Sequence, residues 1–352
     1  FELVDQQLEI DQNFQNELNL INSSLTISKQ CCLKKLILNH SKTINSQLLS
    51  GLEEYHTKDL CYVDEKILQQ NAETLKILIV EDCGKDFFVK CDLPNLDSFY
   101  FRGQSILIND HVSQLKYISI VAKDVDFQLT NPLYQLTAIL LTDVNLPNLN
   151  FTHFTPNLTK LELRNNNLQK IDIDQQCKNL TQLIVFDNPV KTIKIFWSIQ
   201  DITLNNTKIS NLSFLAGFRL LQSLNITSSY LCCLKGIENS SNLFSVNLQN
   251  NFLLTEQFRH LKSFPKLKIK LWQTHGNPID GSLLQKLCSL EQFDGKQYQN
   301  IKPKMFDFDV LAAEKLYQQQ NLLVKRQKLA QLQVKIQLSR QVYKKMQRMF
   351  ES

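Results

Sequence analysis

The sequence predicts an α/β solenoid, in which short parallel strands stack into a concave sheet and irregular or short-helical segments return along the convex side. Three observations predict it. The apolar pattern L-x-x-L-x-L recurs along the 352-residue chain, its starts lie 19 to 22 residues apart from Leu75 onward, and glycine and proline are scarce, at eight each. A unit of this length is one strand with one return segment. Since no unit buries its apolar face alone, neighbouring units must stack.

Residues 1–70 are expected to form degenerate N-terminal repeats. The leucines Leu18, Leu20 and Leu25 make one weak unit, Leu33 opens a clearer one, and a further unit is expected between residues 48 and 67. Atypical repeats are expected at a capping end of a solenoid. Truncation of a longer array would give the same pattern, so both alternatives stay open.

Residues 71–300 are expected to form the regular array and its C-terminal cap. Three residues after the last apolar position of a unit, the clearest units carry asparagine, and others carry a different small or polar residue. A buried polar side chain there can bond the backbone groups left unpaired where the strand turns. We therefore expect an irregular ladder of stacked polar side chains in this column, formed by Asn166, Asn188 and Asn251, with Cys83, Gln104, Thr207 and Ser229 in the other units.

These features resemble the leucine-rich-repeat superfamily over about residues 15–300, and the units of about 22 residues are similar to its intracellular, protein-phosphatase-regulator-like class. The segment from Leu287 to Gly295 is similar to the L-P-x-L-x-x-L-D-G cap of intracellular arrays, with Cys288 in place of proline and Phe293 in place of leucine. The V-T-x-x-E-R continuation of that cap is absent. The resemblance implies a scaffold for protein binding, and the class includes phosphatase regulators and spliceosomal, cytoskeletal or ciliary adaptors.

Side chains alternate along a strand, so the residues between the apolar positions point out of the concave sheet. Up to Phe186 these outward columns carry aromatic, aliphatic and charged residues, whereas beyond it they are mostly neutral and polar. Protein interfaces concentrate aromatic residues and arginine at their centres. The candidate partner-binding patch is therefore Tyr100, Arg102, Tyr117, Leu140, Glu162, Arg164, Ile184 and Phe186. The alternative is that the aliphatic members only pack against their neighbours.

Residues 301–352 are expected to form a basic amphipathic helix beyond Pro303. Apolar residues recur at seven-residue spacing from Leu322 to Phe350, and from Val310 onward nine Lys and Arg stand against two Glu. Such a helix could dock on the array, pair as a coiled coil, or bind a second protein with an acidic surface. The rest of the chain is near neutral. Nucleic acid is disfavoured because no stacking platform or nucleic-acid motif accompanies the basic residues.

The sequence contains no motif of an active site. The six histidines are scattered, none of the nine cysteines forms a C-x-x-C pair, and no phosphate-binding loop or nucleophile motif occurs. We therefore expect no enzymatic activity, no cofactor and no metal, and cysteines that stay reduced in a cytoplasmic protein. No apolar run is long enough to span a membrane.

The leading hypothesis is a protein-protein interaction scaffold or adaptor. One alternative is a structural component of a cytoskeletal or ciliary assembly. A second is a secreted or surface-exposed receptor, since the chain begins at Phe1 and a processed start stays open. The sequence does not identify a partner or an oligomeric state.

Overall fold

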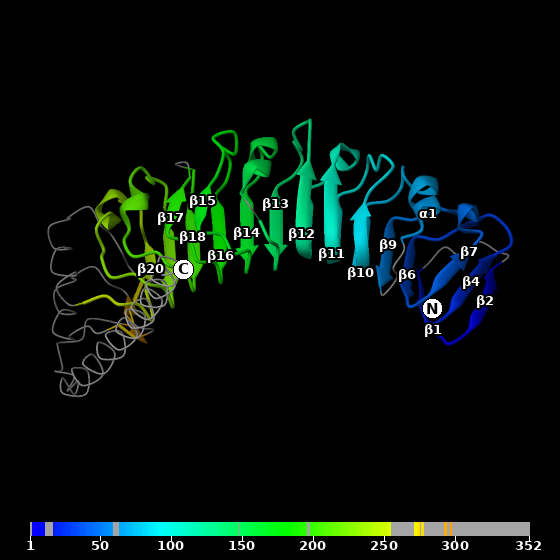
Figure 1. Cartoon of the computed structure of the whole chain (residues 1–352), viewed down its shortest axis with the longest axis horizontal. Helices are drawn as coiled ribbons and strands as arrows, with labels where there is room; N and C mark the ends of the chain where they lie inside the picture. The colour runs from blue at the N-terminus through cyan, green and yellow to red at the C-terminus, as the bar shows by residue number, and fades with distance from the viewer. Residues whose placement is uncertain are drawn as a thin grey trace, which may run out of the picture.

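The computed structural model describes residues 2–10, 17–58, 63–146, 148–195, 198–254, 271–274, 276–277, 292–293 and 296–297. Within these residues the chain forms a curved array built around one 16-stranded sheet, whose strands follow one another in chain order (Figure 1). All neighbouring pairs in this main sheet are parallel except the last, which is antiparallel. Each turn of the chain thus adds one strand, as a solenoid requires.

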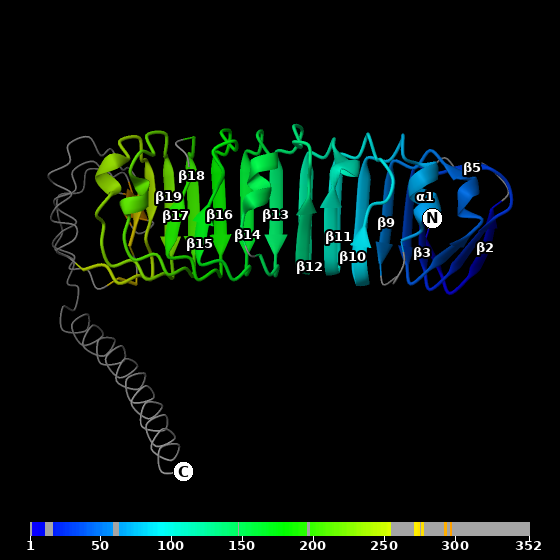
Figure 2. The same ribbon diagram turned by 45° about the horizontal axis from the view of Figure 1, so that its top comes forward.

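The main sheet begins with β1 (Glu2–Val4), β3 (Glu17–Ile21), β6 (Lys35–Asn39), β9 (Glu54–Lys58), β10 (Ile77–Phe88), β11 (Ser98–Asn109) and β12 (Tyr117–Gln128). It continues through β13 (Ala138–Thr142), β14 (Lys160–Arg164), β16 (Gln182–Phe186), β18 (Asp201–Asn205), β19 (Ser223–Thr227) and β20 (Ser245–Asn247). It ends with β21 (Leu271–Gln273), β22 (Gln292–Phe293) and β23 (Lys296–Gln297). Turned by 45°, these strands form an almost straight row (Figure 2).

The predicted apolar columns lie in register across the sheet. The central residues of the repeat pattern pair in sequence from Leu78 to Phe99, Ile118 and onward to Val246, and all of them are buried. The core is one continuous cluster that runs through the described repeats. The prediction of a parallel-strand solenoid is confirmed, and its stability comes from stacking between repeats.

The N-terminal turns are among the shorter ones in the array, and their corners are also closed by hydrogen bonds. Leu18, Leu36 and Tyr55 share one column, so these turns have 18 and 19 residues. Their return segments are strands as well, in a side sheet of β2 (Gln7–Ile10), β4 (Ser24–Ile27) and β7 (Lys42–Ile44) and a pair of β5 (Cys31–Cys32) and β8 (Leu49–Ser50). At the corner, the Ser41 hydroxyl accepts the N–H of Ser23 at 2.9 Å. Serine is sufficient here to form the polar ladder.

The central and C-terminal turns use the predicted asparagine ladder. The Asn188 Oδ1 atom accepts the backbone N–H groups of Asn166 and Leu168 at 3.0 and 3.1 Å, and its Nδ2 atom donates to the carbonyl of Leu163 at 3.1 Å. In the same column, the hydroxyl groups of Thr207 and Ser229 form a hydrogen bond of 3.0 Å with each other. The ladder is therefore present, and it is irregular as expected.

Between these regions, the turns of β11 and β12 lack the sharp corner, and that of β10 keeps a left-handed corner residue, Asp82 with φ of 54°, although the strand continues. β10, β11 and β12 each have 12 residues and continue past the corner beside one another. Gly103 pairs with Cys83 and with Ala122 there. The prediction that Gln104 belongs to the ladder is wrong, since its side chain is exposed. In a strand that does not turn, the third residue after an inward Phe101 points outward, and the second points inward.

The return segments are short. Apart from the N-terminal side strands, the return segments among the described residues contain one helix, α1 (Glu65–Gln70), 3₁₀ turns and a further side sheet of two strands. The 3₁₀ turns are η1 (Ser46–Leu48), η2 (Asp110–Val112), η3 (Asn150–Phe154), η4 (Ser213–Leu215) and η5 (Ile237–Asn239), and the side sheet pairs β15 (Lys170–Asp172) with β17 (Thr192–Lys194).

The predicted basic helix at 301–352 and most of the predicted cap lie outside the described residues. Within the described residues, no helix has both the length and the apolar character needed to cross a bilayer.

Candidate functional site

The exposed face of the main sheet, here called the sheet face, is formed by the outward residues of each strand. Its central column pairs in register from Ile79 through Tyr100, Ser119 and Leu140 to Glu162 and beyond. The five neighbouring strands β11, β12, β13, β14 and β16 carry all eight residues of the predicted patch. Sequence spacing thus predicted which side chains share this face.

One end of the patch is an aromatic pair. The rings of Tyr100 and Tyr117 lie 5.2 Å apart between centroids and are tilted by 42°, an arrangement that aromatic pairs prefer. The Tyr100 side chain is 38% exposed, among the more exposed large apolar residues described. Burial raises the pKa of Tyr100, and Tyr117 and Glu54 add to the rise. Its hydroxyl therefore remains a hydrogen-bond donor at neutral pH.

The other end combines a buried carboxylate with an exposed cation. Glu162 is only 6% exposed, and a buried charge requires partners. It accepts a hydrogen bond from Nε of Arg164 at 2.5 Å and forms an ion pair with Lys160 at 3.5 Å. The guanidinium of Arg164 in turn lies 4.6 Å from the ring centroid of Phe186. Glu162 therefore holds Arg164 over Phe186. Arg164 and Phe186, and not Glu162, offer the accessible contact surface at this end of the patch.

Aliphatic residues connect the two ends. Leu140 and Ile184 are the register neighbours of Glu162 on either side, and both are partly exposed. Arg102 forms an ion pair of 3.9 Å with Asp82. Among the described residues, no ion pair joins it to another member of the patch. The structure thus brings the predicted residues together as two contact groups on one face, with Arg102 at the margin.

The sheet face differs on either side of the patch. Beyond Phe186 it is polar, and Asn205 donates from Nδ2 to the hydroxyl of Thr227 at 2.8 Å. Toward the N-terminus it is charged, with Lys35 bonded to Glu54 at 3.0 Å and His56 at 3.4 Å from Glu81. The sequence analysis missed this charged section, although the outward columns, extended to β6 and β9, contain it.

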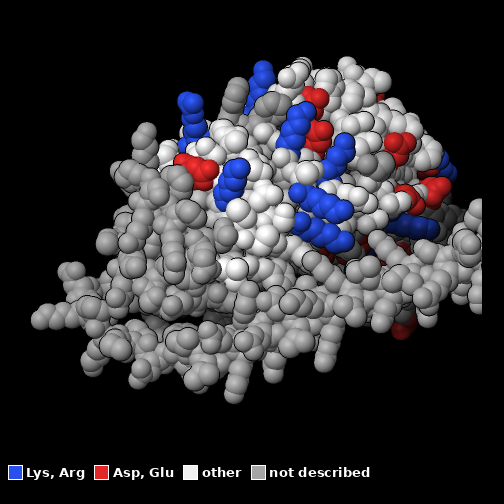
Figure 3. Space-filling view, turned by 60° about the vertical axis from the view of Figure 1, so that its left-hand side comes forward, with Lys and Arg blue, Asp and Glu red and all other residues white. Residues whose placement is uncertain are grey.

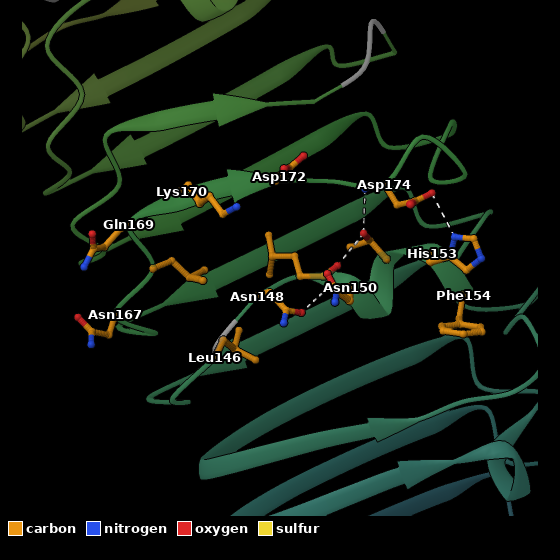
Figure 4. Close-up of a pocket in the computed structure, with 13 residues that line it drawn as sticks. Leu146, Asn148, Asn150, His153, Phe154, Asn167, Gln169, Lys170, Asp172 and Asp174 are labelled. Atoms are coloured by element: carbon orange, nitrogen blue, oxygen red, sulfur yellow. Dashed lines mark hydrogen bonds and ion pairs between the residues drawn. The ribbon is translucent and has the colours of Figure 1, made fainter.

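A cavity lies away from the sheet face, between η3 and β15. Its volume is about 820 Å³, and Figure 4 shows His153 and Asp174 directed toward each other at its edge, 3.4 Å apart. The described part of the chain contains no group of three or more His, Cys, Asp and Glu that could hold a metal ion. The side chains at this cavity do not form a recognisable catalytic arrangement.

Comparison with known proteins gives structural likenesses. An internalin from Listeria monocytogenes, InlF, is similar over 76% of this chain and 81% of its own, with 15% identity and a TM-score of 0.51. A chain of the LRIM1/APL1C complex is similar over 91% of this chain and 63% of its own, with 15% identity and a TM-score of 0.50. No family model matches the sequence, and no curated protein matches it.

The two similar structures are leucine-rich-repeat proteins, and the present chain is a solenoid of stacked parallel strands that is similar to them over most of its length. At 15% identity the likeness concerns the backbone architecture. The chain therefore has the leucine-rich-repeat fold.

Proposed function

We propose that this chain is a non-enzymatic protein-interaction scaffold that binds a partner protein on the sheet face, which we take as the concave face of the array, at the patch of Tyr100, Arg102, Tyr117, Leu140, Glu162, Arg164, Ile184 and Phe186. The observation that supports this most is the continuity of the face. Two exposed groups, one aromatic and one pairing Arg164 with Phe186, lie on neighbouring strands and are connected by Leu140.

The energetics of this patch suit a protein partner. Both groups are held in place by contacts within the sheet, so binding orders few side chains. Tyrosine and arginine are also the residues that dominate measured binding energies at interfaces. An arginine over an aromatic ring contributes about 1 kcal/mol at a partly exposed site. Because Arg164 makes this contact with Phe186 in the free chain, the contact helps to hold the arginine in place before binding.

Charge supports a protein partner over nucleic acid. Basic and acidic side chains are interspersed on the face shown in Figure 3, and the cations of the sheet face mostly have carboxylate neighbours, as Lys35 and Arg164 do. Nucleic-acid binding depends on many cations facing phosphates, and the patch offers only Arg102 and Arg164.

We place the protein in the cytoplasm. The seven cysteines in the described residues are all free thiols, and two of them, Cys32 and Cys232, are exposed. Burial raises the pKa of Cys177 to about 11, so this thiol is held protonated in the core. Free thiols of both kinds are typical of a reducing compartment.

The test is affinity capture with the full chain and two quadruple variants. The patch variant carries Tyr100→Ala, Arg102→Glu, Arg164→Glu and Phe186→Ala. The control variant carries Thr203→Ala, Asn205→Ala, Asn247→Ala and Gln249→Ala on the polar part of the same sheet face. Partners are identified by mass spectrometry, and their affinities are then measured with purified proteins.

We expect the patch variant to bind its principal partner about 100-fold more weakly or worse, because it removes several central side chains. The control variant should bind as the unaltered chain does. Circular dichroism and the urea midpoint verify that each variant is folded. Equal binding by all three folded proteins would show that the partner uses another surface.

A further inference from the structure

Within the described residues, β15 has one edge without a neighbouring strand. On its paired side, the N–H of Ile173, the residue after β15, donates to the carbonyl of Lys194 in β17 at 3.0 Å. On the opposite side, the N–H of Asp174 donates to the hydroxyl of Thr152 in η3, also at 3.0 Å. Successive residues of a strand direct their backbone groups to opposite edges. The N–H and C=O groups of Lys170 and Asp172 therefore point toward η3.

Nothing in the described residues bonds to these backbone groups of Lys170 and Asp172. The strand edge opens instead into the cavity of about 820 Å³, and Figure 4 shows β15 on one side of it and η3 on the other. A row of unpaired backbone donors and acceptors beside an open groove is the arrangement that accepts an added strand.

The groove has an apolar floor and a polar rim. Leu146, Leu149 and Leu168 line it and are buried, whereas the side chains of Lys170 and Asp172 are exposed. In a strand added to this edge, side chains would alternate between the floor and the rim. The inward ones would therefore be apolar, and the outward ones would be polar.

The charges at the rim further define the occupant. Asp172 has an ion pair with Lys194 at 3.5 Å, and Asp174 has one with His153 at 3.4 Å. No ion pair is formed by Lys170 with any described residue. The rim thus offers one unpaired cation, directly beside the free strand edge, and an acidic side chain on the added strand would complement it.

We propose that this edge is a second binding site, distinct from the sheet face, where an extended peptide of a partner protein is added to β15 as an additional strand. The peptide places an acidic side chain beside Lys170 and an apolar one over the leucine floor. Its affinity comes from main-chain hydrogen bonds to Lys170 and Asp172, and its specificity comes from the alternating side chains.

The first experiment uses a fluorescein-labelled synthetic heptapeptide, Thr-Val-Glu-Val-Thr-Val-Thr, and fluorescence anisotropy with the full chain. Two further versions are N-methylated on alternate backbone nitrogens, one version for each edge of the peptide. We expect saturable binding, a loss of at least about tenfold for one methylated version and little change for the other. Absence of saturable binding, or equal binding of all three peptides, would overturn the proposal.

Two variants locate the site. Asp172→Pro removes a donor on the groove side and leaves the bonds between β15 and β17 in place, since proline is tolerated where the N–H faces outward. We expect it to weaken peptide binding about tenfold or more. Lys170→Glu should weaken the glutamate-containing peptide, whereas Lys178→Glu, a matched exposed lysine outside the groove, should not. If neither groove variant changes the affinity, the peptide binds elsewhere.

Amide hydrogen exchange at single-residue resolution tests whether the edge is free. In the chain without peptide, the amides of Lys170 and Asp172 should exchange rapidly while that of Ile173 is protected, and saturating peptide should protect all three. Protection of Lys170 and Asp172 without peptide would mean that another segment of this chain or a second copy covers the edge. That result would contradict the proposal without affecting the patch on the sheet face.

Discussion

The turns of β11 and β12 and those of β14 and β16 satisfy the backbone N–H and C=O groups at the corner in two different ways. Where β14 and β16 end, Asn165 and Asp187 adopt left-handed backbone angles, with φ of 50° and 52°. The chain turns there, and the next residue, asparagine, bonds the unpaired groups. In β11 and β12 no residue at the corner has positive φ, and the strands continue in pairs. Backbone groups are then satisfied by the neighbouring strands, so the polar side chain is not needed.

The comparison also explains why the sheet face is continuous across the two types of turn. Register passes from Val121 of β12 to Thr142 of β13 and on to Arg164 without a shift. The corner comes after these residues in each strand. The way in which the chain turns there therefore does not change which side chains point out of the sheet face. The proposed patch crosses the boundary, with its tyrosines on the continuous strands and Glu162, Arg164 and Phe186 on the turned ones.

The largest expected effect separates the two types of corner. Asn188→Ala removes the side-chain partner of two buried N–H groups and of the Leu163 carbonyl, whereas the Phe186 carbonyl keeps the N–H of Asn165. We expect a loss of about 3 kcal/mol in the free energy of unfolding. Gln104→Ala, three residues after the inward Phe101, changes an exposed side chain and should cost less than about 0.5 kcal/mol. Urea unfolding of both variants measures the difference. Similar losses would mean that the continuous strands also depend on a corner side chain.

A smaller effect is expected at Gly103, where β11 leaves no room for a side chain beside β10. A Cβ atom added there would lie 2.6 Å from the carbonyl oxygen of Cys83 and 2.6 Å from the ring of Phe101. Gly103→Ala should therefore cost about 2 kcal/mol by overpacking. The Gln104→Ala variant serves as the neighbouring control. An unchanged urea midpoint for Gly103→Ala would show that β10 and β11 can separate without loss.

The apolar columns and the outward columns could be predicted from the sequence because stacking constrains them. A strand that must bury Leu161 and Leu163 has to expose the residue between them or provide it with partners, and Glu162 has both Lys160 and Arg164. Spacing alone predicted the register of the sheet face from Ile79 to Asn247.

Other features depended on geometry that the repeat pattern does not determine. Gln104 was misplaced because the pattern assumes a turn that the chain does not make. The left-handed residue before each ladder position was missed, although Asn and Asp tolerate this conformation and the column contains Asn22, Asp143, Asn165, Asp187 and Asn250. The free edge of β15 depends on η3 replacing a strand in the preceding turn, which no residue pattern in that turn predicted. The basic helix at 301–352 stays a prediction.

The most direct test of the central claim is site-specific photo-crosslinking across the sheet face. A photoreactive phenylalanine analogue is placed at Tyr100, at Phe186 or at Thr203 in the full chain, one position at a time, and crosslinked partners are identified by mass spectrometry. If the patch binds one protein across the boundary between the two types of turn, positions 100 and 186 will crosslink to the same partner and position 203 will not. Crosslinking of different proteins at 100 and 186, or of the principal partner only at 203, would contradict this account.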